Sequence, residues 1–329
     1  MPQTAADLIE LWRGDLKESV HCGHAVICDS HGIVEAWGRA SKVVYPRSSC
    51  KMIQALPLVE SGAAEAFGLT PRHLALACAS HQGTPMHTGI VAEWLQRIGC
   101  AEPDLRCGAH LPTDPAERQR MICADEAPCQ LHNNCSGKHT GFLTLNRHIN
   151  GGAEYIEIDH PVQKMVRAAF EDLTDDEAAG WGIDGCSAPN FACTVEGLAR
   201  AMQRFATPGP DMRGAAQRRL TEAMLTYPEL VAGEGRADTE LMRAMGGKVV
   251  LKMGAEAMYV AILPEQGVGV ALKVSDGGRR GAEAAITALM IHLGALDPAH
   301  PVVAKYLTGP IRNWRGLLTG ELRRAPGFP

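Results

Sequence analysis

The sequence predicts an α+β protein in which strands from both ends of the chain form one antiparallel sheet, with a large helical segment inserted between them. Two β-rich segments lie near the start, and three alternating segments lie near the end. Between these groups, residues 49 to about 205 show mainly helical periodicity. Strands grouped in this way do not form alternating βαβ units, so we expect helix, sheet and helix layers (αβα).

The 329-residue length allows either two domains or one large one, and we expect a single domain, 1–329. Its sheet lobe should comprise about 1–47 and 245–329, and its helical lobe about 48–244. Thr4 to Trp12 reads as a short helix, since Thr4 can cap a helix start and Asp7 follows three positions later.

The remaining elements follow in chain order. Strands at 20–29 and 33–37 flank a short turn and predict a hairpin. The expected helices cover 51–67, 71–80, 87–99, 136–148, 160–173 and 194–206. Strands return at 248–253, 258–264 and 268–274, and a final helix is expected at 280–293.

Composition and charge exclude several classes of protein. Hydrophobic residues are 46% of the chain and charged residues 21%, which is usual for a folded globular protein and not for a disordered one. The 32 basic and 37 acidic residues leave a net charge of -5, without a long basic run. The sequence therefore shows no nucleic-acid or membrane-surface footprint, and a small molecule is the expected partner.

Eleven cysteines are an odd number, and a chain of this length does not need disulfides to hold a core. The first residues lack the basic start and apolar run of a secretory signal, and no stretch approaches about 18 apolar residues. We therefore expect a cytoplasmic protein with reduced thiols.

Ser48 and Lys51 have S-x-x-K spacing at the start of the first long helical segment. Three residues are almost one helical turn, so both side chains would share a face, and the helix dipole would favour a developing alkoxide at Ser48. A lysine shielded from water can act as the base that a serine nucleophile needs. On spacing alone, a capping serine beside a solvated lysine is the favoured explanation of the pattern.

The wider context strengthens the catalytic interpretation. Penicillin-recognising serine enzymes combine S-x-x-K at a helix start with a later K-T-G on a strand. Here Lys252-Met253-Gly254 ends a predicted strand, and Ser80 lies in the interval where a second hydroxyl would be needed. Ser275-Asp276 comes after Lys252, which is the wrong order for the S-D-N element.

Several ordered blocks together make the chain resemble the bacterial-type asparaginase II family, whose characterised members are rhizobial L-asparaginases of the third structural class. The blocks are Arg13-Gly14 with Glu18-Ser19 and His21; Arg47-Ser48-Ser49 with Lys51 and Gln54-Ala55-Leu56; Ser80-His81; Asn134-Cys135-Ser136-Gly137-Lys138-His139; Asp184-Gly185-Cys186; Lys252 with Gly254-Ala255-Glu256; and Asp276-Gly277 before Arg280. The family is similar in fold to serine β-lactamases and glutaminases.

The resemblance implies hydrolysis of the side-chain amide of L-asparagine to aspartate and ammonia by a homodimer. It implies two Ser-Lys tandems, Ser48 with Lys51 and Ser80 with Lys252, with Ser48 as the nucleophile. A helix-terminal hydroxyl and a snorkelling lysine are the structural alternatives for Ser80 and Lys252.

The resemblance also implies a Zn²⁺ ion that helps to position the substrate and is bound by Cys135, Lys138 and Cys186. Chemistry alone would favour His139 or His132 as the third ligand, since imidazole is the commoner partner of thiolate. The structural alternative is two reduced loop thiols beside a surface lysine.

Arg47 is a candidate clamp for the substrate α-carboxylate, Asp184 for the α-ammonium group, and His139 for a further substrate contact. Surface ion pairing, an Asx turn and a loop-bracing histidine are their respective alternatives. Compared with the family pattern, Met52 stands where proline is common, and Ala257 and Ser187 stand where glycine is common.

Two other classes of function remain open on the sequence. One is a different serine acyl-transfer hydrolase on the same scaffold, such as a glutaminase, a β-lactamase-like enzyme or an esterase. The other is a zinc- or amino-acid-binding protein without turnover.

Overall fold

The computed structural model describes residues 4–329 and divides into two compact units. The sheet unit comprises Met1–Ser49, Cys193–Thr207 and Glu240–Pro329. The helical unit comprises Cys50–Ala192 and Pro208–Thr239. Each unit is described by itself.

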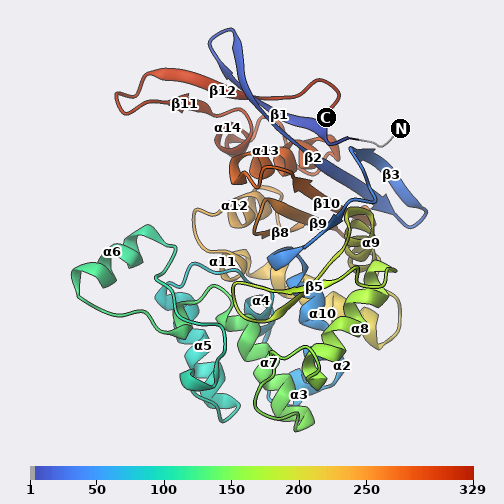
Figure 1. Ribbon diagram of the computed structural model, residues 1–329, viewed down its shortest axis with the longest axis vertical. Coiled ribbons are helices and arrows are strands. Elements are labelled where there is room, and N and C mark those ends of the chain that lie inside the picture. Colours follow the sequence, from blue (N-terminus) through green and yellow to red (C-terminus); the bar gives the residue numbers. More distant parts are fainter. Residues whose placement is uncertain (1–3) are drawn as a thin grey trace. The chain divides into compact units, whose positions relative to one another are not determined.

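The core of the sheet unit is an eight-stranded antiparallel sheet that takes strands from both ends of the chain (Figure 1). The strand order is β11-β12-β1-β2-β10-β9-β8, and β3 pairs with β2 beside this path. The strands are β1 (Ala6–Arg13), β2 (Leu16–Asp29), β3 (Gly32–Trp37), β8 (Val250–Gly254), β9 (Met258–Leu263), β10 (Val268–Val274), β11 (Pro310–Arg312) and β12 (Leu318–Arg324). A short pair, β4 (Val43–Val44) with β7 (Cys193–Thr194), lies in the same unit. The α+β class and the composite sheet are therefore confirmed.

The expected helix at 4–12 is wrong, because this segment contains strand β1. Ile9 pairs with His21 of β2 on one side and with Arg324 of β12 on the other. Pairing on both edges of the strand buries residues 8–11. A helix capped at Thr4 would not make these pairings. Tertiary pairing has overridden the local helix-start signal.

The predicted hairpin is confirmed as β2 and β3, and the three late strands are confirmed as β8, β9 and β10. The final predicted helix is α13 (Arg279–His292). Two elements that the sequence did not indicate, β11 and β12, extend the sheet beyond β1. The sheet unit also contains the helix α14 (Pro301–Tyr306).

Helix α9 (Val195–Ala206) belongs to the sheet unit, although the expected boundaries put it in the helical lobe. It packs against β2, β9 and β10. At Gly269 of β10, an added Cβ would overlap the backbone of α9 at Gln203, so glycine permits this close approach. Burial against the sheet therefore draws residues 193–207 away from their helical neighbours in the sequence.

The helical unit is built around α7 (Ser136–Ile149), which contacts α2, α3, α4, α5 and α8 (Figure 1). Every residue of α7 from Ser136 to Asn146 is buried. The other helices are α1 (Lys51–Gln54), α2 (Leu56–Glu60), α3 (Ala63–Ala66), α4 (Pro71–Ala77), α5 (Pro85–Arg97), α6 (Pro115–Cys123), α8 (Pro161–Thr174), α10 (Met212–Thr226) and α11 (Pro228–Val231). The unit also contains the single-turn helices η2 (Glu102–Asp104) and η3 (Gln130–His132) and the strand pair β5 (Trp181–Ile183) with β6 (Pro189–Phe191). Helix α12 (Ala237–Ala244) begins in this unit and ends in the sheet unit.

The expected helix at 51–67 is divided into α1, α2 and α3. Pro57 lies in the first turn of α2, where its missing amide hydrogen is tolerated but a continuous helix from α1 is not. Gly62 then takes φ 80° before α3, a left-handed conformation that glycine adopts without strain.

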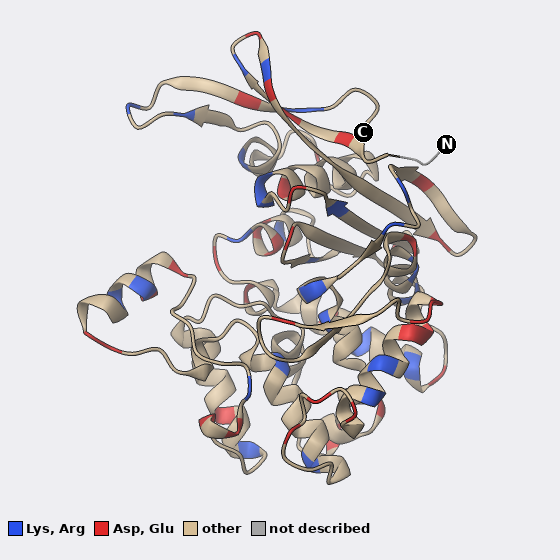
Figure 2. Ribbon diagram, viewed as in Figure 1, with Lys and Arg blue, Asp and Glu red and all other residues tan. Residues whose placement is uncertain are grey.

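Within residues 4–329, no helix has the length and apolar character needed to cross a membrane. Figure 2 shows lysine and arginine interspersed with aspartate and glutamate along both units.

Candidate active site

Ser48 lies in a single-turn helix, η1 (Arg47–Cys50), which runs directly into α1. The preceding residue, Arg47, has φ 53°, a left-handed conformation that is unusual for a residue with a Cβ atom and is often found at functional sites. Ser48 is partly exposed, whereas Ser49 is buried and donates its hydroxyl to the carbonyl of Pro46 at 2.7 Å. Of these two adjacent serines, Ser48 is therefore the one that keeps some exposed surface.

Lys252 lies on β8 in the sheet unit and is completely buried. Its Nζ donates to the carbonyl of Met253 at 2.8 Å. The end of the same strand touches the start of η1, since a Cβ added at Gly254 would lie 2.5 Å from the Pro46 carbonyl oxygen and 3.1 Å from the Ser49 nitrogen. Within the sheet unit, the strand that carries Lys252 therefore supports the turn that carries Ser48.

The turn after Gly254 contains two residues in the left-handed conformation, Glu256 with φ 57° and Ala257 with φ 58°. The family pattern commonly has glycine at the second of these positions, which is the residue type that adopts this conformation without strain. Nearby, the Asp276 carboxylate lies 2.6 Å from His21 Nδ1, which joins the first and the last of the sequence blocks. A Cβ on Gly277 would lie 2.8 Å from the Glu256 carboxylate. These blocks thus shape one corner of the sheet unit.

Lys51 is buried at the start of α1 in the helical unit, and its ammonium nitrogen meets three different groups. It donates to the carbonyl oxygen of Ala79 through a very short hydrogen bond. It also lies 3.1 Å from Ser80 Oγ and 3.1 Å from Cys135 Sγ. Within this unit the structure therefore places Ser80 beside Lys51, a contact that the paired tandems did not include.

Cys135, Cys186 and Lys138 form a buried cluster in the same unit. Lys138 Nζ donates to Cys186 Sγ at 3.0 Å. A hydrogen bond from Cys135, together with the positive charge of Lys138, holds the pKa of Cys186 well below its usual range despite burial. The same hydrogen bond and burial raise the pKa of Cys135 well above its usual range. The cluster thus pairs a thiolate at Cys186 with a thiol at Cys135.

Lys138 carries the positive charge that stabilises this thiolate. Burial lowers the pKa of Lys138, but attraction to Cys186, Cys135 and Asp184 outweighs that effect, so the pKa is raised overall. The ammonium form is therefore the stable one while the cluster consists of protein groups alone.

This donor set suits a zinc ion by its chemistry, since two sulfur atoms and one amine lie together in a buried cluster. Both Cys135 and Lys138 would release a proton on binding. No group of three or more His, Cys, Asp or Glu side chains within residues 4–329 is placed to hold a metal ion. Any metal at the cluster would therefore depend on the lysine amine as its third protein ligand.

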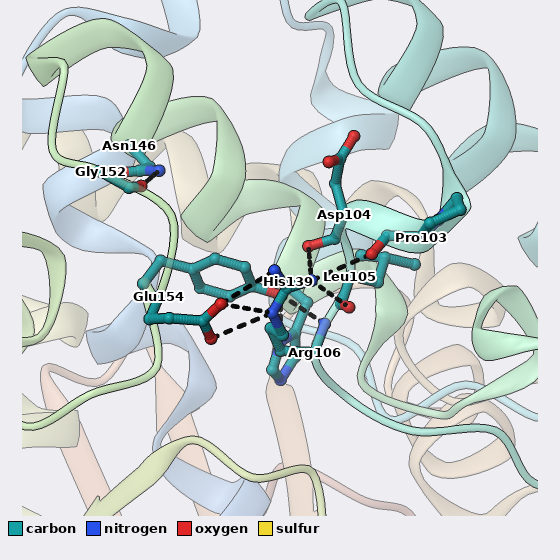
Figure 3. Close-up of polar contacts among 9 residues, drawn as sticks. Pro103, Asp104, Leu105, Arg106, His139, Asn146, Gly152 and Glu154 are labelled. Atoms are coloured by element: carbon teal, nitrogen blue, oxygen red, sulfur yellow. Dashed lines mark hydrogen bonds and ion pairs between the residues drawn. The ribbon is translucent and has the colours of Figure 1, made fainter.

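His139 follows Lys138 on α7, and its ring lies among aromatic side chains. Its Nδ1 is 2.9 Å from the hydroxyl of Tyr155, which in turn accepts the backbone N–H of Arg106 at 2.9 Å (Figure 3). Burial lowers the pKa of His139, although attraction to the Cys186 thiolate opposes this in part. Burial thus favours the neutral form of His139. Through Tyr155, the ring links the cluster of Cys135, Lys138 and Cys186 to the loop at Arg106.

Asp184 is near enough to Lys138 to raise its pKa by Coulombic attraction. Its carboxylate accepts the backbone N–H of Gly185 at 2.7 Å. The backbone N–H of Ser187 donates to the Asp184 carbonyl at 2.9 Å, and Ser187 takes φ 70°, where the family pattern has glycine. Asp184 therefore belongs to the tight turn that carries Cys186.

His81, one residue after Ser80, braces the loop that carries Ser80. It is buried, its Nδ1 accepts the backbone N–H of Gly83 at 3.1 Å, and its Nε2 lies 2.9 Å from Ser136 Oγ. Since Nδ1 accepts a hydrogen bond, Nε2 carries the proton and donates to Ser136. This bond ties the loop of Ser80 to the first turn of α7.

The contact between Lys51 and Cys135 is a feature that spacing along the chain did not reveal. The two residues are 84 positions apart and lie on different elements. The only signal was that each belongs to one of the ordered blocks, which locate residues along the chain but not their contacts.

The family of this chain follows from a comparison with models of protein families. The model of the L-asparaginase II family matches residues 9–324. A comparison with curated proteins finds no matching relative. Among solved structures, a β-lactamase from Mycobacterium bovis has 13% identity and a TM-score of 0.47, and the match covers 82% of this chain and 94% of that one. A structure described as a probable glutaminase from Bacillus subtilis has 11% identity and a TM-score of 0.40, over 83% of this chain and 85% of that one. Because the family match spans nearly the whole chain, this protein belongs to the L-asparaginase II family.

Proposed function

We propose that this asparaginase-type amidohydrolase hydrolyses the side-chain amide of L-asparagine to L-aspartate and ammonia through an acyl-enzyme at Ser48. The observation that carries the proposal is the partly exposed Ser48 hydroxyl at a strained helix start, three residues before a buried lysine. Membership of the L-asparaginase II family supports the choice of amide.

The reaction begins when Ser48 Oγ attacks the amide carbon while a neutral amine at Lys51 accepts the hydroxyl proton. The attack gives a tetrahedral oxyanion, which backbone N–H groups at the start of the helix would stabilise. When the carbon–nitrogen bond breaks, the leaving nitrogen takes up a proton and departs as ammonia. Water then hydrolyses the β-aspartyl ester and returns the proton to the serine.

Ser80 and Lys252 are the groups that we propose for the proton delivered to ammonia. The hydrogen bond of Ser80 with Lys51 supports this role, because a hydroxyl in contact with an amine can pass a proton in either direction. Lys252 is completely buried on the strand that supports the turn of Ser48, so its amine is shielded from bulk water.

The charged ends of the substrate require complementary groups. We propose that the Arg47 guanidinium binds the α-carboxylate and that Asp184 and His139 contribute to binding at the α-ammonium end. A Zn²⁺ ion bound by Cys135, Lys138 and Cys186 would supply a fixed positive charge for substrate positioning. In this role the zinc-binding residues affect substrate affinity more than the chemical step.

The test is ammonia release by the purified protein with L-asparagine, L-glutamine and a chromogenic β-lactam as parallel substrates. We expect turnover of L-asparagine to exceed that of the other two, and the Ser48→Ala variant to lose at least about 10³-fold in kcat. Mass spectrometry of rapidly quenched wild-type protein should find a β-aspartyl group on the peptide that contains Ser48.

The matched control is Ser49→Ala, which removes the adjacent hydroxyl that is committed to the Pro46 carbonyl. This variant should keep kcat to within several-fold. Equal losses from both substitutions would show that the helix start matters only structurally. Binding of L-asparagine without ammonia release by the wild-type protein would favour a binding protein and contradict the proposal.

A further inference from the structure

A cavity lies in the helical unit, at the C-terminal end of α7. Its volume is about 660 Å³, within the usual range for a site that binds a small molecule. Arg147 lines this cavity nine residues after Lys138 on the same helix, which corresponds to about 13 Å along the helix axis. The cavity is therefore separate from the cluster of Cys135, Lys138 and Cys186.

Three apolar side chains from different helices form part of the cavity wall. Ile98 and Leu143 are almost fully buried, and Phe67 lies at the end of α3. A wall of this kind favours a ligand with an apolar portion, because water leaves both surfaces on binding.

Two arginines line the cavity, but their guanidinium groups differ in how they are engaged. Arg106 is held by the Glu154 carboxylate at 3.0 to 3.2 Å and by the carbonyls of Pro103, Asp104 and Leu105 (Figure 3). Arg147 donates to the Gly99 carbonyl at 2.7 Å and, within residues 4–329, has no carboxylate partner. Arg147 is thus the guanidinium available to bind an anionic group.

A carboxylate that could accept hydrogen bonds from a cation lines the same cavity. The Asp104 carboxylate points away from Arg106 in Figure 3 and has no ion pair in the described part of the chain, although it accepts the backbone N–H of Ala101 at 2.8 Å. Asn146 is 7% exposed, and its Nδ2 donates to the Gly152 carbonyl at 2.5 Å. Its Oδ1 is covered by protein and does not reach the cavity. The wall therefore offers one positive charge and one negative charge that have no ion pair among residues 4–329.

We propose that this cavity binds a free α-amino acid with an apolar side chain. Arg147 binds the α-carboxylate, Asp104 faces the α-ammonium group, and Phe67, Ile98 and Leu143 contact the side chain. A zwitterion matches one charge of each sign, whereas a polyphosphate would need several uncommitted cations. This site is additional to the proposed reaction and does not depend on it.

The test is isothermal titration of the full-length protein with L-leucine and with 4-methylpentanoate, which lacks the amino group. We expect L-leucine to bind at one site, and 4-methylpentanoate to bind at least about tenfold more weakly because it makes no contact with Asp104. Arg147→Ala should weaken L-leucine binding by at least about tenfold. Arg118→Ala, which changes an exposed arginine on α6, should leave the affinity unchanged.

Cysteine protection locates the ligand without reference to turnover. Cys100 lines the cavity and is half-buried, whereas Cys123 is exposed on α6. Saturating L-leucine should slow the alkylation of Cys100, measured by peptide mass spectrometry, and leave Cys123 unchanged. Arg147→Ala is an exposed substitution, and its fold is checked by circular dichroism.

Three results would overturn the proposal. They are the absence of L-leucine binding, equal affinity of the wild-type and Arg147→Ala proteins, and equal binding of L-leucine and 4-methylpentanoate. Each can occur whether or not Ser48 is the nucleophile, because the binding measurements need no reaction. A failure here is therefore distinguishable from a failure of the proposed hydrolysis.

Discussion

The two units bury their candidate catalytic lysines in different ways. Lys252 of the sheet unit lies in the middle of strand β8, and its amine donates to the carbonyl of the next residue, Met253. Lys51 of the helical unit contacts a carbonyl, a hydroxyl and a thiol from separate parts of the chain. A strand places Lys252 through its backbone, whereas side-chain and loop contacts place Lys51. Within the helical unit, Lys51 therefore contacts two groups that can exchange a proton with it, the Ser80 hydroxyl and the Cys135 thiol.

Backbone strain and charge are also distributed differently. In the sheet unit, left-handed conformations at Arg47, Glu256 and Ala257 shape the turns around Ser48 and β8. In the helical unit, the thiolate of Cys186 and the ammonium group of Lys138 stabilise each other in a buried cluster. Substitutions at these turns of the sheet unit should therefore act through backbone geometry, and substitutions of Cys186 or Lys138 should act through charge.

The largest effect should come from Lys51→Met, which removes the proposed base and keeps a long apolar side chain in its place. We expect kcat for L-asparagine to fall by at least about 10³-fold, in the range of a lost general base. Lys164→Met on α8 is an exposed control and should keep full activity. Ammonia release measures both variants, and a loss of less than about tenfold in Lys51→Met would remove Lys51 from the reaction.

Lys252→Met should have the next largest effect, with a loss in kcat of about 10²-fold. Its amine contributes to proton delivery, but the strand around it is apolar and accommodates methionine well. Comparison of kcat for Lys252→Met and Lys51→Met shows which of the two lysines contributes more to the reaction. If Lys252→Met is the more damaging variant, the proposed assignment of the base is reversed.

Removal of metal should act mainly on binding. Treatment with a chelator is expected to raise KM for L-asparagine by about tenfold and to change kcat by less than about threefold, because zinc is proposed to position the substrate. Zinc content measured by atomic emission should be lost in Cys186→Ser and kept in Cys123→Ser, whose thiol is exposed. Full zinc content in Cys186→Ser would place the metal elsewhere.

Stability of the helical unit should fall in mild acid because of two stacked histidines. The rings of His81 and His87 lie 4.8 Å apart, and burial lowers the pKa of both. The unfolded chain gains a proton at each near pH 6.5 while the folded protein does not, so stability is complete above that pH and is lost as the pH falls below it. The loss is about 1.4 kcal/mol per pH unit for each histidine that stays neutral.

Urea unfolding between pH 7.5 and pH 5 measures this slope. The His87→Gln variant removes one of the two groups and should show a shallower dependence. An unchanged slope in the variant would show that other groups, outside this stacked pair, control the acid response.

The smallest effect is expected at the strained turn of the sheet unit. Ala257→Gly places the permissive residue at φ 58° and should raise the free energy of unfolding by about 0.5 to 1 kcal/mol. The corresponding rise in Tm, measured by calorimetry, is about 1 to 3 °C. Ala255→Gly, two residues earlier, should not stabilise the protein, and equal stabilisation by both would argue against strain at Ala257.

Local signals in the sequence were sufficient for many elements. The hairpin of β2 and β3 and the strands β8 to β10 follow from alternation and turn residues, which are properties of adjacent positions. The segment that forms β1 has a helix-like start, but it is a strand because its partner β12 lies about 300 residues later in the chain. The same distance hides the role of residues 318–324, which have little strand character of their own.

The sequence by itself determined the family, the fold class and the order of the polar blocks, since these depend on residue identity and spacing. It also indicated the replacement of glycine at Ala257 and Ser187, and the structure shows left-handed conformations at both. Long-range contacts bring Lys51 to Ser80 and Cys135, pack α9 on the sheet, and place Arg147 at a cavity with no carboxylate partner among residues 4–329. The physical reason is that contacts, burial and charge pairing depend on segments far apart in the chain, whereas periodicity and motifs depend on neighbours.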